Sequence, residues 1–372
     1  MSQSKKKIVY VINNLVFGGA QNQLVNQLKY FDKQKYEFHL VTLATYVGKD
    51  TLYDRLPADV IVHTLNFKGF KNIKGWLSLY RCLKKISPDL VISSLFFSNT
   101  VVRILKLLLQ YPVITREHNT YANKSWYHQW VDKFLAPISA TIVAVSQEVA
   151  DFTAKQEGIP VTKFTVINNG IDIEAVQKKQ QQVDKMSVKN TLGLNDSDKV
   201  VLYVGRLIQQ KKLDVMIRGF AIFTKENADW KLLIVGGGGL EGDLRKLIEA
   251  EGVARNIMLL GEQDNVHQYY AIGNCLLSTS VMEGMSNVHL EALAHGLPIL
   301  STRTGGTSSI IEEGINGFII PKIEPEAVTD TLKHFTKVNQ KAMSEASIKI
   351  SSDFSIQEVV KRYEILFERY TN

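Results

Sequence analysis

Two cations and two glutamates in the second half of the chain have types and spacings that could handle a phosphorylated ligand. Arg206 and Lys211 follow the apolar run 199–204 and are five positions apart. An arginine fork and a compact ammonium can together neutralise a diphosphate on which negative charge develops. Glu283 and Glu291 are separated by seven residues near the predicted start of a helix. Together these residues predict a site for a ligand that carries both phosphate and hydroxyl groups.

The segment between the two glutamates supplies backbone donors of a suitable kind. Gly284, Met285, Ser286 and Asn287 lead from a loop into the helix, and N–H groups at a helix start bind anions. In this interpretation phosphate rests on these amides, the loop glutamate binds sugar hydroxyls, and the helix glutamate binds a ribose diol. Each pattern also has a structural alternative, because acidic residues favour helix N-termini in general and a basic loop is usually only solvated.

Two further places carry candidate residues. Gly18 and Gly19 stand between the apolar run 7–12 and a predicted helix, where free N–H groups suit a sugar phosphate. The alternative is that these glycines only permit a tight turn. His118 comes just after the predicted strand 112–115, at the edge of the sheet that faces an expected cleft. Its structural alternative is an ordinary loop histidine.

The elements that must position these residues alternate between strands and helices. Strands are predicted at 7–12, 37–43, 89–92, 112–115, 140–145 and 164–167, and again at 199–204, 231–235, 257–260, 274–278, 298–301 and 317–320. This alternation predicts parallel sheets covered by helices. The stretch 178–190 is polar and lacks apolar periodicity, so it is interpreted as a linker between two Rossmann-like α/β domains. Ligands of such sheets bind off the carboxyl ends of the strands, here in a cleft between the domains.

Composition and charge limit the partners and the cellular compartment that fit this sequence. The 372 residues are 45% hydrophobic, enough for two cores, and the net charge of +7 with a pI of about 9.1 favours anionic partners. Cys82 and Cys275 are isolated, which predicts no disulfide, no zinc site and a reducing compartment. The apolar run 8–12 is too short for a signal peptide, and no run is long enough to span a membrane. A cytoplasmic location is therefore expected.

Two other motifs point to different chemistry. Residues 237–242 match G-x-G-x-x-G and Glu262 follows 20 residues later, as in a nicotinamide-cofactor site. The motif lies on a middle strand of the second half rather than in an opening βαβ unit, so an NAD(P)-dependent oxidoreductase is the alternative and not the main hypothesis. Asp196 and Asp198 form a D-x-D, but they precede a strand in a turn-like segment. Neither a metal site nor a cofactor is predicted.

The segment 66–87 contains six Lys or Arg residues and no acidic residue, with Ile73, Trp76, Leu77, Tyr80 and Leu83 at helical spacing. A basic amphipathic helix of this kind can lie on an anionic membrane. The alternative is a helix that packs its apolar side on the sheet. Nucleic acid is not expected as a partner, because no recognised binding module accompanies the charge.

The combination of Arg206, Lys211 and the E-x7-E pair resembles the large retaining glycosyltransferase family 4. The resemblance extends from the glycine pair near residue 18 through the Asn-Gly-Ile-Asp segment at 169–172 to Gly305-Gly306. It implies a GT-B fold, with residues 1–178 as the N-terminal acceptor domain, completed by a last helix over 355–372. Residues 190–352 would form the nucleotide-sugar donor domain. One departure is Lys212, which stands where the family commonly has a glycine after the lysine.

The resemblance also implies roles and partners. Arg206 and Lys211 would hold the diphosphate, Glu283 the transferred sugar, Glu291 the ribose, and His118 would lie near the donor sugar. The implied activity is metal-independent hexosyl transfer with retention, from a UDP-sugar to a glycan or lipid-linked glycan in polysaccharide biosynthesis. The enzyme would be cytoplasmic and peripheral at the inner face of the membrane. A nucleotide-sugar epimerase and a non-catalytic sugar-nucleotide binding protein are the alternatives on the same fold.

Overall fold

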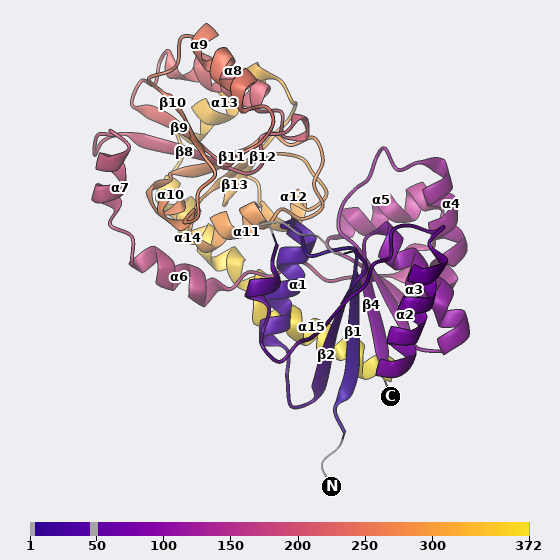
Figure 1. The fold of residues 1–372 in the computed structure, drawn as a ribbon. Helices are drawn as coiled ribbons and strands as arrows, with labels where there is room; N and C mark the ends of the chain where they lie inside the picture. Colours follow the sequence, from indigo (N-terminus) through magenta and orange to yellow (C-terminus); the bar gives the residue numbers. More distant parts are fainter. Residues whose placement is uncertain (1–3, 45–50, 372) are drawn as a thin grey trace. The chain divides into compact units, whose positions relative to one another are not determined.

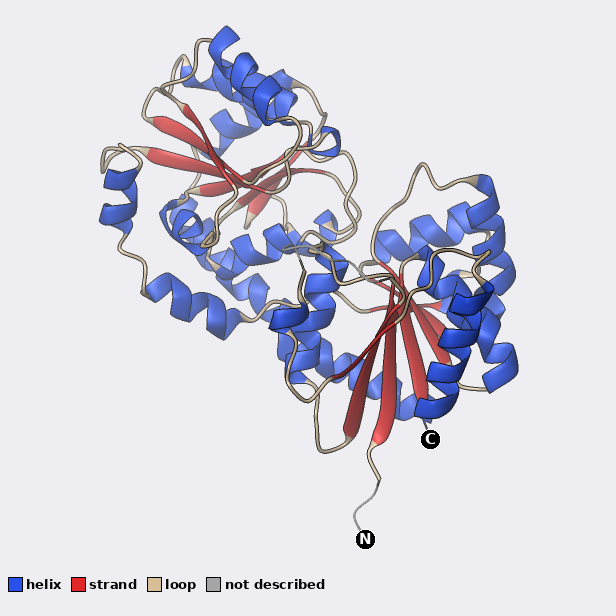
Figure 2. Ribbon diagram, in the orientation of Figure 1, coloured by secondary structure: helices blue, strands red, loops and turns tan. Residues whose placement is uncertain are grey.

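Short apolar runs form parallel sheets in the computed structural model, which describes residues 4–44 and 51–371 (Figures 1 and 2). The chain divides into unit 1, which comprises Met1–Gly170 and Ile356–Asn372, and unit 2, which comprises Ile171–Ser355. Each unit has its own sheet with helices on both faces.

The sheet of unit 1 has the strand order β3-β2-β1-β4-β5-β6-β7, with parallel pairing throughout. Its strands are β1 (Lys6–Ile12), β2 (Tyr36–Thr42), β3 (Ile61–Thr64), β4 (Leu90–Ser94), β5 (Val113–Glu117), β6 (Thr141–Ala144) and β7 (Phe164–Val166). Its helices are α1 (Gly19–Tyr30), α2 (Ile73–Ile86), α3 (Phe96–Leu109), α4 (Trp126–Leu135), α5 (Gln147–Glu157) and α15 (Ile356–Thr371). The strand order reverses between β1 and β4, as in Rossmann folds.

Alternate residues of β1 enter two different cores. Ile8 and Tyr10 pack with α1 and the last helix, α15, whereas Val9 and Val11 pack with α2 and α3 on the other face. Strands buried on both faces are typical of parallel sheets. The apolar stripe of α15, which includes Tyr363, is buried in unit 1. The last helix therefore completes the N-terminal unit.

The sheet of unit 2 has the strand order β10-β9-β8-β11-β12-β13, again with parallel pairing. Its strands are β8 (Lys199–Val204), β9 (Trp230–Val235), β10 (Ile257–Gly261), β11 (Cys275–Ser278), β12 (Ile299–Thr302) and β13 (Gly317–Ile320). Its helices are α6 (Ile173–Gln181), α7 (Lys185–Thr191), α8 (Leu213–Thr224), α9 (Glu241–Ala250), α10 (His267–Ile272), α11 (Asn287–Ala294), α12 (Thr307–Ile310), α13 (Pro325–Phe335) and α14 (Gln340–Ser351). This order reverses between β8 and β11, which makes the loops after these two strands the expected ligand-binding loops.

Every strand predicted from the sequence is present, and the structure adds one and corrects three points. β3 was not predicted because Ile61 and Val62 are exposed on an edge strand and give no buried run. The segment 178–190 is not an irregular linker: it forms the end of α6 and most of α7, which belong to unit 2. Unit 1 therefore ends at residue 170 rather than 178, and unit 2 covers 171–355 rather than 190–352.

The third correction concerns the basic helix. In α2 the residues turned inward are Gly75, Leu79, Leu83 and Ile86, so the predicted apolar stripe is split. Ile73 and Leu77 are exposed and Leu83 is buried. Within the described ranges 4–44 and 51–371, no helix is long and apolar enough to cross a membrane.

Candidate active site

The loop after β8 is fastened to the loop after β11, its neighbour across the point where the strand order reverses. The Gln210 side chain donates to the Met282 carbonyl at 2.5 Å, and the Val281 amide donates to the Gln210 carbonyl at 2.9 Å. The Thr279 hydroxyl hydrogen-bonds the carbonyl oxygens of Lys211 and Lys212 at 2.8 and 3.0 Å. These bonds fix the short 3-10 turn Gln209–Lys211 and with it the direction of the lysine side chain.

Lys211 and Glu283 form an ion pair across these two loops. Their side chains are 17% and 18% exposed, so the pair is largely withdrawn from solvent but still reachable. Two predicted site residues, 72 positions apart in sequence, thus meet at the place where an open parallel sheet binds its ligand. An ammonium and a carboxylate side by side can hold a phosphate and a hydroxyl of one ligand.

Lys212 has φ +49° and ψ +45°, the left-handed region that favours glycine. A glycine, which the family resemblance implies at this position, would adopt this backbone readily, and here a lysine adopts it. Because Lys211 is the residue paired with Glu283, it is the better candidate for the phosphate ligand.

Arg206 lies at the start of the same loop with an exposed side chain. Its carbonyl accepts a hydrogen bond from the Tyr203 hydroxyl at 3.0 Å. Burial raises the pKa of Tyr203, and the charges of Glu283 and Arg206 act on it in opposite directions. Both charged groups are therefore close to this tyrosine, at the carboxyl end of β8.

The glycine-rich segment after β9 is explained by contact between loops. A Cβ on Gly236 would lie 2.0 Å from the Gly205 carbonyl oxygen, and one on Gly238 would lie 2.5 Å from the Leu207 carbonyl oxygen. Both glycines have positive φ, +133° and +156°. They let this segment pack against the loop that carries Arg206. Gly237, the first glycine of the G-x-G-x-x-G match, lies against Glu262, because a Cβ there would be 2.7 Å from the Glu262 side chain.

Helix α11 begins at Asn287, with Ser286 at the N-cap position and no side-chain cap bond. The preceding loop is held in place because the Gly305 amide donates to the Glu283 carbonyl at 2.9 Å. A Cβ on Gly306 would lie 2.6 Å from the Gly284 carbonyl oxygen. The Gly305-Gly306 pair therefore packs directly on this loop. The predicted order of loop, helix start and inner glutamate is thus present.

Glu291 lies in the second turn of α11, and its Oε2 accepts a hydrogen bond from the Tyr270 hydroxyl at 2.9 Å. Burial raises the pKa of Glu291, while the Tyr270 bond and Lys179 act to lower it. The Tyr270 ring stacks on His295 with 4.7 Å between ring centroids. Sequence reasoning missed Tyr270, because a tyrosine in a short helix carries no signal for a partner 21 residues away.

In unit 1 the predicted residues lie at the carboxyl ends of β1 and β5. Gly18 is the N-cap of α1 and Gly19 its first residue, as predicted. Gly18 has an extended backbone, φ −168°, which any residue could adopt. The loop before it is tied to α3, because the Asn13 side chain accepts from the Ser98 amide and hydroxyl at 3.2 and 2.5 Å.

His118 follows β5 directly, and its Nε2 is buried with no hydrogen-bond partner within the described residues. Burial, reinforced by the charge of Arg116, lowers the pKa of His118 well below its ordinary value. The imidazole is therefore neutral near pH 7 and can donate or accept a hydrogen bond without carrying charge.

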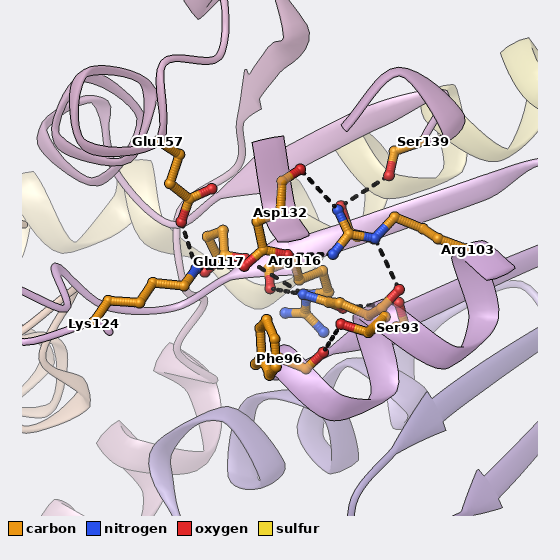
Figure 3. A network of polar contacts seen from close by, with 12 residues as sticks. Ser93, Phe96, Arg103, Arg116, Glu117, Lys124, Asp132, Ser139 and Glu157 are labelled. Carbon is orange, nitrogen blue, oxygen red and sulfur yellow. Dashed lines mark hydrogen bonds and ion pairs between the residues drawn. The ribbon is translucent and has the colours of Figure 1, made fainter. Parts of the chain in front are cut away.

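The residue before His118 belongs to a buried charged network, which Figure 3 shows in close view. Asp132 pairs with Arg103 and, at 2.6 Å, with Lys124, which also pairs with Glu157. Burial raises the pKa of Glu117, and burial together with the charge of Glu117 raises the pKa of Glu157 to about 8. This network joins β5, α3, α4 and α5 and fixes the strand end that carries His118.

The candidate residues divide between the two units. Unit 2 brings Lys211 and Glu283 into contact and sets Glu291 in the helix that follows, whereas His118 and the glycine pair at 18 and 19 belong to unit 1. Each set lies at the carboxyl edge of its own sheet. Asp198 uses a carboxylate oxygen to accept from the Asn195 amide at 2.8 Å, which fits the turn interpretation of the D-x-D.

Comparison with known proteins agrees with this architecture. Residues 184–349 match the family model for glycosyl transferases group 1, and residues 17–175 match the model for glycosyltransferase family 4. The chain is 24% identical, over 98% of its length and 97% of the relative's, to the UDP-Gal:alpha-D-GlcNAc-diphosphoundecaprenol alpha-1,3-galactosyltransferase of Escherichia coli.

Solved structures show the same fold. Anabaena HepE in complex with UDP superposes with a TM-score of 0.84 at 19% identity, covering 98% of this chain and 100% of HepE. A glycosyltransferase from Rickettsia africae superposes with a TM-score of 0.85 at 18% identity, covering 99% of each chain. The two parallel sheets, the likeness to these solved structures and both family models lead to one assignment: the chain belongs to the retaining glycosyltransferases of family 4, which have the GT-B fold and use nucleotide-sugar donors.

Proposed function

We propose that this enzyme transfers a hexose from a UDP-sugar to a glycan or lipid-linked glycan acceptor, with retention of the anomeric configuration and without a metal ion. The observation that carries the proposal is the contact between Lys211 and Glu283 where the strand order of unit 2 reverses. A cation for the diphosphate and a carboxylate for the sugar are adjacent there, as a nucleotide-sugar requires.

In the proposed reaction the bond between the anomeric carbon and the diphosphate oxygen breaks, and its electron pair stays on the diphosphate. Arg206 and Lys211 offset the charge that develops there, together with backbone amides at the start of α11. The acceptor hydroxyl attacks the anomeric carbon from the same face, and its proton passes to the leaving diphosphate oxygen. Configuration is retained in this front-face route.

The remaining residues position the donor. Glu283 hydrogen-bonds hydroxyls of the transferred sugar, and Glu291, held by Tyr270, binds the ribose diol. The neutral imidazole of His118 supplies a hydrogen bond to the sugar from unit 1, and the amide groups near Gly18 and Gly19 take part in donor binding. In this assignment Arg206, Lys211 and Glu283 act in the transition state, whereas Glu291 contributes to binding of the ground state as well.

The choice of UDP and of a glycan acceptor rests on the relatives. The Escherichia coli relative is described as using UDP-Gal and a GlcNAc-diphosphoundecaprenol acceptor, and the HepE structures contain UDP. An epimerase on the same fold would isomerise its donor without any acceptor, and a binding protein would not turn the donor over. The oxidoreductase alternative is set aside, because the family is established.

The test begins with thermal unfolding in the presence of UDP-, GDP- and ADP-sugars. A ligand at about 100 times its dissociation constant stabilises the native state by roughly 2.7 kcal/mol, so the cognate nucleotide should stand out. The selected donor is then incubated with and without glycan acceptors while nucleoside diphosphate release is followed. Release that requires an acceptor supports transfer. Isomerised sugar without an acceptor, or binding without turnover, would replace the proposal with one of the alternatives.

A further inference from the structure

Helix α4 exposes its aromatic side. Trp126, Trp130 and Phe134 recur every four residues, so they form one stripe, and they are 79%, 60% and 69% exposed. The rings of Trp130 and Phe134 stack with 5.5 Å between their centroids. The residues of α4 that are buried are Asp132 and Leu135. A helix at a water-covered surface normally has the opposite arrangement, with its apolar stripe inward.

The stripe continues into an apolar groove of about 370 Å³ between α3 and α4. Phe70, Phe96 and Ile104 line it opposite the rings of Trp130 and Phe134. One turn beyond Ile104, two leucines of α3 are also exposed. We call this surface the aromatic patch, and it comprises Phe70, Ile104, Leu107, Leu108, Trp126, Trp130 and Phe134. A contiguous apolar surface of this kind indicates an interaction site.

Exposed cations adjoin the aromatic patch in sequence. Between residues 66 and 137 seven Lys or Arg residues are exposed, among them Lys71 and Lys74 beside Phe70 in sequence and Lys133 within α4. The acidic residues of this range, Asp89, Glu117 and Asp132, are half-buried or buried, and the last two belong to the network of Figure 3. The aromatic patch thus has a cationic border formed by Lys71, Lys74 and Lys133, which adjoin its residues in sequence.

We infer that the aromatic patch docks unit 1 on an anionic lipid bilayer, with the rings of Trp126, Trp130 and Phe134 entering the interface and the lysines contacting headgroups. Tryptophan is the residue that favours the membrane interface, and Lys or Arg near an anionic leaflet add electrostatic attraction. A second copy of this chain fits less well. A symmetric contact would bring two identical cationic borders together, and like charges repel.

The position of the groove gives this docking a consequence. Phe96, at one end of the groove, is the first residue of α3 and follows β4 almost directly, so it lies at the carboxyl edge of the sheet. Docking would therefore bring that edge of unit 1 close to lipid. The inference does not depend on sugar transfer, and it differs from the sequence-based expectation: α2 supplies lysines, but the inserting rings belong to α4.

The direct test is binding of the full chain to phosphatidylcholine vesicles with and without phosphatidylglycerol. Tryptophan fluorescence reports the geometry, because Trp126 and Trp130 are exposed whereas Trp76 is half-buried and Trp230 is buried. We expect a blue shift on anionic vesicles and quenching by lipids with brominated acyl chains. Brominated chains quench only a ring that has entered the bilayer.

Two pairs of variants separate the apolar and the electrostatic contribution. Trp130→Ser combined with Phe134→Ser should weaken binding by about 100-fold or more, since burying each ring contributes at least about tenfold. Lys71→Ala combined with Lys74→Ala should weaken binding to anionic vesicles by about 30-fold. The matched controls are Ile365→Ser and Lys361→Ala on α15 of the same unit, which are equally exposed and should bind as wild type. Unchanged melting temperatures confirm that all variants are folded.

Three results would overturn the inference: no binding of the wild-type chain to anionic vesicles at low salt, binding without quenching by brominated chains, or equal losses in the control variants. Sedimentation adds a further outcome. If the wild type self-associates, the ring variants are monomeric and vesicle binding is unaffected, the aromatic patch is a contact between copies and not a membrane surface.

Discussion

Replacing Lys211 by methionine removes the cation that we assign to the diphosphate while keeping the length of the side chain. The structure allows two distinct consequences to be estimated. If Lys211 stabilises charge that develops on the leaving group, turnover falls by roughly 100- to 1000-fold, or about 2.7–4 kcal/mol of transition-state stabilisation. The second consequence is for stability, because the substitution also removes the ion pair with Glu283. Because both side chains are about one-sixth exposed, it should cost stability less than the 3–5 kcal/mol of a fully buried pair, on the order of 1 kcal/mol.

A double-mutant cycle with Glu283→Gln distinguishes direct roles from an indirect one. If each residue contacts the donor, the double variant loses more turnover than either single variant, with a coupling between the two losses because the residues are ion-paired. If Lys211 only orients Glu283, the double variant is no worse than Glu283→Gln alone. The assay is steady-state release of nucleoside diphosphate at saturating acceptor, with urea unfolding as the measure of stability. Lys212→Met is the matched control, because it removes a neighbouring cation that has no ion pair with Glu283.

The assignment would be refuted by Lys211→Met that keeps near wild-type turnover at an unchanged melting temperature. A loss in Lys212→Met but not in Lys211→Met would place the phosphate on the other lysine. Arg206→Ala extends the test, since an exposed arginine can be removed with little effect on folding and should still lower turnover about 100-fold.

Three further outcomes are expected. Turnover should persist in excess EDTA, since cations and amides are assigned to the diphosphate; loss that only magnesium or manganese restores would contradict this. Tyr270→Phe removes the 2.9 Å bond to Glu291 and should raise the Michaelis constant for donor about tenfold with little change in kcat, and a selective fall in kcat would place the pair in the chemistry instead. Glu157, whose pKa is raised to about 8, keeps a proton in the native state that the unfolded chain releases, so stability should fall as pH rises from about 5 to 8. Glu157→Gln should flatten that dependence in urea unfolding, and an unchanged slope would assign it to other groups.

Much of the fold could be predicted because parallel strands are buried on both faces and appear as continuous apolar runs. Residues 199–204 and 231–235 are of this kind, whereas β3, an exposed edge strand, gave no such signal. The polar stretch at 178–190 was misinterpreted for a related reason. Its helices α6 and α7 bury only one residue between them, Val176, so apolar periodicity could not reveal them.

The sequence alone could nominate candidate site residues, but it could not show which groups hold them in place. Arg206, Lys211, Glu283 and Glu291 have chemistry that is unusual at their positions, next to the ends of predicted strands. The groups that hold them, such as Thr279, are ordinary polar residues whose partners are far away in sequence. Only the folded chain shows which carbonyl or carboxylate each of them meets.

The ion pair between Lys211 and Glu283 also has a consequence for donor binding. In the protein without donor, each side chain balances the charge of the other in a largely solvent-shielded place. A diphosphate that takes Lys211 releases the Glu283 carboxylate, which is then available to sugar hydroxyls on the same donor. We infer that the two contacts form together, so a free nucleoside diphosphate should bind less favourably than the complete nucleotide-sugar. Glu283→Gln has no carboxylate charge to release, so it should reduce the difference in affinity between the nucleotide-sugar and the free nucleoside diphosphate. Calorimetric titration with both ligands measures the two dissociation constants. A wild-type enzyme that binds the free diphosphate as tightly as the donor, with the same ratio in Glu283→Gln, would show that the pair plays no part in donor selection.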